Sequence, residues 1–227
     1  VDGKPLVNDD LEVKGGALDL DRARMVPVSD SFTVMVQGQP FGFQVTSLER
    51  DGDGWAYRER SQLATVVQQQ TDVRFGADLT MRSTRQSGRF QGQDMRLELS
   101  YANGTVSGEG VTPGAQGMSP VKFEGVATPV GTVDDNLVQG LLPYFKWTAD
   151  ASFTVAVLAS GKGVVEPRTY RVAAQEEITI PLGTFNTYRV TVSGGEQPGT
   201  YWVEVAAPHR VMKFGPASAP IEFVRAR

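Results

Sequence analysis

The chain has 227 residues, and its 22 lysines and arginines against 26 aspartates and glutamates give a formal net charge of −4. This balance lacks the basic footprint of phosphate recognition and therefore argues against nucleic acid as a partner. The absence of cysteine excludes a disulfide framework and thiolate chemistry, and no apolar run reaches the roughly 18 residues of a membrane-spanning helix.

The N-terminal segment differs in composition from the rest. Residues 1–30 mix glycine, proline and acidic residues without a helical period, which indicates an extended arm. The sequence starts at Val1 and shows no charged-then-apolar leader. We therefore expect a processed or trimmed chain that has already lost any signal segment or lipid anchor.

Residues 31–227 are predicted to form a single β domain. Short runs rich in Val, Thr, Phe and Tyr alternate with period two and are separated by turn residues. The sharpest turn is Asn103-Gly104, because both residues tolerate the positive φ of a type I′ hairpin. A sheet with this many strands twists and rarely stays open beyond about ten strands. We expect an all-β fold, mainly one strongly curved antiparallel sheet that forms a half-barrel or open barrel.

One short helix is predicted to cover this sheet, from Asp134 to Leu142. Asp134 or Thr132 is expected as its N-cap, and Pro143 ends it. The helix and the segment after it bring seven bulky apolar side chains together: Leu137, Val138, Leu141, Leu142, Tyr144, Phe145 and Trp147. These seven residues form the predicted ligand-binding site for an apolar molecule, and the alternative is that they fill the curved sheet as ordinary core.

No residues form a recognisable catalytic or metal-binding constellation. His209 has no second histidine to complete a metal site. Asp51-Gly52-Asp53-Gly54 resembles the start of a calcium loop, but an EF-hand frame would place Ala56 at the required glycine and Gln62 at the required glutamate. We therefore expect no catalytic residue, no metal ion and no cofactor.

The C-terminal half carries a distinctive pattern of turns and core positions. A Pro-x-Gly-x-Phe turn ends the run Ile178 to Phe185, an aromatic pair follows at Tyr201-Trp202, and the last strands open after Pro208. Over residues 31–227 this pattern resembles the DUF3108 family of bacterial envelope proteins of unknown function. Such proteins are similar in architecture to periplasmic lipoprotein carriers of the LolA and LolB type. The resemblance implies a curved sheet around an apolar cavity and a periplasmic or outer-membrane location.

Three functions are compatible with these features. The favoured one is a non-enzymatic binding module of the cell envelope that holds a lipid, an acyl chain or another apolar or amphipathic small molecule. The second is a structural or assembly protein that pairs with an envelope protein partner through exposed sheet edges. The third, which the sequence supports least, is a hydrolase whose two carboxylates are brought together by the fold.

Overall fold

The computed structural model describes residues 16–114, 117–195 and 198–227. These residues form fifteen strands in one sheet, one α-helix and two short 3-10 helices, of which η1 is Arg22–Arg24. The first eight strands are β1 (Val28–Val36), β2 (Gln39–Asp51), β3 (Gly54–Leu63), β4 (Val67–Gly76), β5 (Met81–Phe90), β6 (Gln93–Ala102), β7 (Thr105–Gly114) and β8 (Gly117–Ala127). The others are β9 (Val133–Asp134), β10 (Ser152–Ala159), β11 (Val164–Ile180), β12 (Gly183–Ser193), β13 (Gly199–Glu204), β14 (Val211–Pro216) and β15 (Ile221–Arg225).

The two halves of the chain meet where β15 pairs with β1. The strand order is β8-β7-β6-β5-β4-β3-β2-β1-β15-β14-β13-β12-β11-β10-β9, and every pair is antiparallel except β9 with β10. Phe32 lies opposite Arg225 in the central pair. The buried Arg225 guanidinium donates to the Val211 carbonyl at 3.1 Å and pairs with Asp30. This junction starts before the predicted arm boundary, because β1 already begins at Val28.

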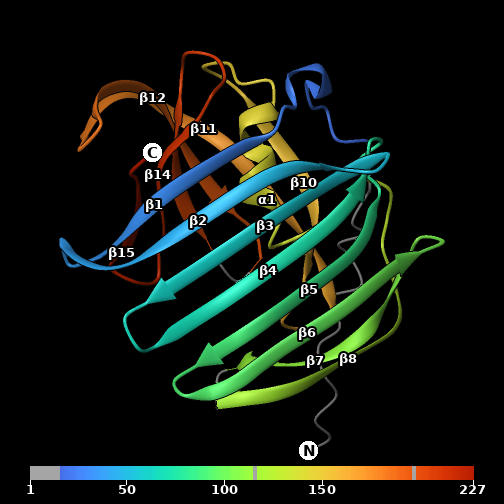
Figure 1. The fold of residues 1–227 in the computed structure, drawn as a ribbon. Helices are drawn as coiled ribbons and strands as arrows, with labels where there is room; N and C mark the ends of the chain where they lie inside the picture. Colours follow the sequence, from blue (N-terminus) through green and yellow to red (C-terminus); the bar gives the residue numbers. More distant parts are fainter. Residues whose placement is uncertain (1–15, 115–116, 196–197) are drawn as a thin grey trace, which may run out of the picture.

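The sheet is rolled, not closed. Its end strands β8 and β9 are not neighbours in the strand order of the described residues. Figure 1 shows β1–β8 as one wall and β10–β14 as the other, with the helical segment between them. Leu158 of β10 packs against Leu97, Leu99 and Phe123, so one end of the sheet lies against the inner face of β6–β8. The predicted curved antiparallel sheet is confirmed in this form.

The covering helix is shorter than predicted. Helix α1 spans Val138–Leu141 and continues into η2 (Leu142–Tyr144). Asp134 belongs to β9, and the N-cap residue is Leu137. The predicted N-cap, Asp134 or Thr132, is therefore wrong. Hydroxyl groups from the opposite wall donate to one oxygen of the Asp134 carboxylate, and the Thr132 hydroxyl donates to the Pro129 carbonyl. No helix in the described ranges is long and apolar enough to cross a bilayer.

Glycine permits a very close backbone contact in the rolled wall. Gly108 of β7 has φ of 153°, and a Cβ atom there would lie 2.0 Å from the carbonyl oxygen of Glu98 on β6. Because that oxygen belongs to the neighbouring strand, it cannot retreat without disturbing the β6–β7 pairing. The curvature at this point therefore depends on the missing side chain.

Replacing Gly108 by alanine should lower the free energy of unfolding by more than about 1 kcal/mol, because the new Cβ meets backbone atoms. Urea denaturation followed by tryptophan fluorescence measures this change. Gly161→Ala is the matched control, since a Cβ at Gly161 meets nothing within 4 Å. Equal stability of the two variants would contradict the role given to Gly108.

Candidate functional site

The seven residues predicted to bind a ligand lie inside the main core. Their exposed fractions range from 0% at Leu142 to 6% at Trp147. The Trp147 indole Nε1 donates to the Leu142 carbonyl at 2.8 Å, which fixes the exit of the helical segment. Of the seven, Phe145 also lines the large cleft described next. Ligand binding by this set stays a prediction.

A cleft of about 570 Å³ opens beside this core. It lies between residues 16–19, residues 145–148 and strand β10. Phe145, Phe153 and Val155 give it apolar lining. The Lys146 ammonium group, which also lines the cleft, pairs with the exposed carboxylate of Asp19. The cleft therefore combines an apolar lining with a charged pair.

Aromatic rings continue from the cleft across the inner face of the C-terminal wall. Phe145 stacks on Phe153 with ring centroids 4.1 Å apart, and Phe153 stacks on Tyr170 at 5.5 Å. Tyr201, Phe214 and Phe223 extend the row, with centroid distances of 6.4, 5.3 and 4.4 Å. Stacked cross-strand rings restrict one another, so the aromatic side of the cleft is preorganised.

Strand β10 has a free edge at the cleft. β11 pairs with the whole of β10, whereas β9 pairs only with Val157 and Leu158. The Leu158 carbonyl points to the β9 side, where it accepts from the Asp135 N–H at 3.1 Å. Backbone groups of alternate residues point the same way along a strand. Those of Ser152 and Thr154 therefore point to this side, where no described strand pairs with them.

A buried carboxylate joins the rolled end of the sheet to the opposite wall. Asp134 is 0% exposed. Its Oδ2 accepts from Thr84 Oγ1 on β5 at 2.8 Å and from the Tyr101 hydroxyl on β6 at 2.6 Å. Its Oδ1 accepts from the backbone N–H and the side-chain amide of Asn136, at 3.0 and 2.8 Å. Both oxygens are thus fully engaged, which makes Asp134 a structural residue inaccessible to a substrate.

The neighbouring Asp135 is an unusual acid. Burial, reinforced by the charge of Asp134, raises the pKa of Asp135 to about 7. Ser160 Oγ donates to it at 2.6 Å and opposes this shift. Burial and Asp134 likewise raise the pKa of Tyr101, so its hydroxyl remains a donor at neutral pH.

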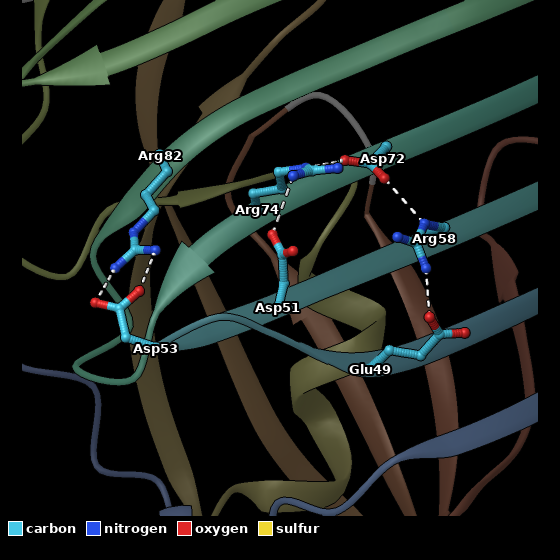
Figure 2. Close-up of polar contacts among 7 residues, drawn as sticks. All are labelled: Glu49, Asp51, Asp53, Arg58, Asp72, Arg74 and Arg82. Atoms are coloured by element: carbon cyan, nitrogen blue, oxygen red, sulfur yellow. Dashed lines mark hydrogen bonds and ion pairs between the residues drawn. The ribbon is translucent and has the colours of Figure 1, made fainter.

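The acidic turn that resembles a calcium loop is a charged hairpin. Asp51 accepts from Arg74 at 3.1 Å, and Asp53 accepts from both terminal nitrogens of Arg82 at 2.7 and 2.9 Å (Figure 2). Arginine therefore occupies the carboxylates that a metal would need. The described part of the chain holds no cluster of three or more potential metal ligands. His209 lies in a turn, with Nδ1 3.0 Å from the Glu204 carbonyl oxygen.

Comparison with known proteins identifies the family. The model of DUF3108, described as a protein of unknown function, matches residues 31–219, which is most of the chain. The chain belongs to the DUF3108 family. A crystal structure of a β-barrel-like DUF1849 protein from Brucella abortus is similar to this DUF3108 chain, with 9% identity and a TM-score of 0.52. The match covers 89% of this chain and 95% of that one, and it shows a shared fold.

The family assignment expected from the sequence is confirmed, whereas the likeness to lipoprotein carriers stays a prediction. A search of curated proteins finds no match. Sequence reasoning missed Thr84 and Tyr101, which lie 50 and 33 residues from Asp134. It also missed Phe153, which lines the cleft, and Tyr170, which stacks on Phe153 in the aromatic row. The sequence does show aromatic residues within these strands. Their stacking could be predicted only if it were known which residues lie opposite one another on neighbouring strands.

The raised pKa of Asp135 makes stability depend on pH. The folded protein holds a proton on Asp135 up to about pH 7, whereas an unfolded aspartate releases it near pH 4. Asp135 therefore destabilises the fold increasingly as pH rises between these values. The stability of Asp135→Asn relative to the wild type should rise over this range by about 1 kcal/mol or more. Urea denaturation at several pH values measures the difference.

Asp94→Asn provides the control for this pH series, because Asp94 is an exposed carboxylate on a hairpin. Its stability difference from the wild type should change much less over the same range. A flat profile for Asp135→Asn, or equal slopes for the two variants, would contradict the protonation assigned to Asp135.

Proposed function

We propose that this DUF3108 protein is a non-enzymatic binding protein that holds an apolar or amphipathic ligand, such as a lipid or acyl chain, in the cleft beside β10. The observation that carries the proposal is the cleft itself. Its volume of about 570 Å³ lies within the range of ligand pockets, roughly 300 to 1,000 Å³. A folded, well-packed core behind it supplies a rigid surface.

The lining of the cleft suits a molecule with an apolar body and a polar end. Phe145, Phe153 and Val155 offer apolar surface for a hydrocarbon chain. The backbone groups of Ser152 and Thr154, which pair with no strand of the described residues on the cleft side, offer hydrogen bonds to a headgroup, and the pair Lys146–Asp19 offers charge. This distribution favours an amphipathic ligand over a purely apolar one.

We propose a periplasmic or outer-membrane location, which rests on the likeness to lipoprotein carriers expected from the sequence. Cell fractionation of a host that expresses the complete gene tests it. Recovery of the protein in the periplasmic or outer-membrane fraction supports the proposal, and retention in the cytoplasm contradicts it.

The free edge of β10 supports a second candidate, pairing with a strand of a partner protein. Ser152–Ala159 contains no charged residue and no proline, the two devices that commonly protect sheet edges. Strand β8, at the opposite end of the sheet, carries Pro120 and Lys122. Thr154→Pro removes an N–H from this edge of β10, so it should abolish strand pairing in a co-purification assay, and unchanged pairing would contradict this second candidate.

Filling the cleft tests the favoured function. Thr154 is one of the residues that line the cleft, so Thr154→Arg adds a charge to this lining, and affinity for the neutral dye N-phenyl-1-naphthylamine should fall at least about tenfold, equivalent to 1.4 kcal/mol. Fluorescence titration measures the affinity. Mass spectrometry of extracts from the purified wild type should also detect a bound lipid.

Thr179→Arg is a closely matched control. Thr154 and Thr179 are both exposed, and each hydroxyl contacts a threonine across the strand pair, at 2.8 and 3.0 Å respectively. Only Thr154 lines the cleft. Equal dye binding by the two variants, or no dye binding by the wild type, would refute the proposed site.

A further inference from the structure

A second cleft, of about 550 Å³, crosses the outer face of strands β2 to β6. Cross-strand pairing places its lining in two rows. Arg60 and Arg96 lie in one row, linked through the pairs Arg60 with Gln70, Gln70 with Ser87 and Ser87 with Arg96. The adjacent row runs through Arg58, Asp72, Arg85 and Glu98. We call this cleft the outer groove.

Several arginines on this face, including Arg58 of the outer groove, are paired with carboxylates. Figure 2 shows Arg58 between Glu49 and Asp72, Arg74 between Asp51 and Asp72, and Arg82 paired with Asp53. The contacts of Arg58 and Arg74 form one connected network through Asp72, and Arg82 with Asp53 is a separate pair. Arginine on this face of the sheet therefore usually has an acidic partner within the chain.

Three arginines of the outer groove have no such acidic partner among the residues that the structure describes. Arg60, Arg85 and Arg96 have exposed side chains, and the structure shows no ion pair for them within the residues it describes. Arg85 lies opposite Asp72 on one side and Glu98 on the other without pairing with either. Arg60 lies over the ring of Phe43 at 5.9 Å, which orients its guanidinium without cancelling its charge.

The spacing of these charges matches an extended ligand. Arg60 on β3 and Arg96 on β6 are three strand spacings apart, which corresponds to about 14 Å. Arg85 lies on β5 in the adjacent row. A single small anion cannot span Arg60 and Arg96, whereas a chain with repeated anionic groups can reach all three. The outer groove also carries four arginines against two carboxylates on its outward face, Asp72 and Glu98.

We propose that the outer groove binds a linear polyanion, whose phosphate or carboxylate groups pair with Arg60, Arg85 and Arg96. Guanidinium groups bind both kinds of oxyanion through paired hydrogen bonds. The floor is the backbone of the sheet, so the ligand lies across the strands between two rows of side chains. This site is separate from the cleft beside β10, and neither proposal depends on the other.

Binding of inorganic polyphosphate and of the carboxylate polymer polygalacturonate tests the proposal by isothermal titration calorimetry at low and moderate salt. The wild type should bind at least one of them, and its affinity should fall as salt rises. The triple variant Arg60→Gln, Arg85→Gln, Arg96→Gln should bind at least about tenfold more weakly. The polymer that binds distinguishes a phosphate-bearing ligand from a carboxylate-bearing one.

Arg89→Gln is the control for charge alone. Arg89 lies on β5, the strand of Arg85, but it pairs with Asp94 and does not line the outer groove. Its affinity should stay within about twofold of the wild type, since it makes no contact with the ligand. The proposal fails if neither polymer binds, if the triple variant binds as well as the wild type, or if Arg89→Gln loses as much affinity.

Discussion

The buried carboxylate of Asp134 is the constraint on which the rolled sheet depends. An open sheet of fifteen strands has two ends, and here hydrogen bonding between its edges does not join them. Asp134 makes the connection through side chains, because Thr84 and Tyr101 donate to it across the interior. A buried charge is tolerable only when its hydrogen bonds are satisfied. Because the hydrogen bonds of Asp134 come from Thr84 on β5 and Tyr101 on β6, they fix where β9 and β10 lie against these two strands.

The position of β9 determines what the helical segment and β10 can do. Since β9 is only two residues long, it covers little of β10, and no strand of the described residues pairs with Ser152 and Thr154 on that side. The chain then turns into α1 and η2, which fill the space between the walls with buried apolar residues. Buried side chains consequently fill the space between the walls, and the proposed lipid cleft lies at the rim, where the core meets the edge of β10.

Much of the fold could be predicted because it is local. Period-two alternation and turn chemistry at Asn103-Gly104 specify strands and hairpins within a few residues of sequence. The seven apolar residues of 137–147 were likewise visible as a cluster. Contacts such as Asp134 with Thr84 could not be predicted, since they depend on how far the sheet rolls. A carboxylate just before a helix is also an ordinary N-cap in sequence terms, and only the tertiary structure shows that Thr84 and Tyr101 donate to one of its oxygens.

The central claim is that the ligand site lies at the rim beside β10 and not within the core between the walls. A crystal structure of the protein soaked with a brominated fatty acid tests it most directly, because anomalous scattering locates the bromine. We predict a bromine peak between residues 16–19 and strand β10, with Phe145 and Phe153 beside the chain. A peak among Leu137, Leu141 and Leu142, with the core displaced, would contradict the claim, as would the absence of any peak in the cleft at saturating ligand.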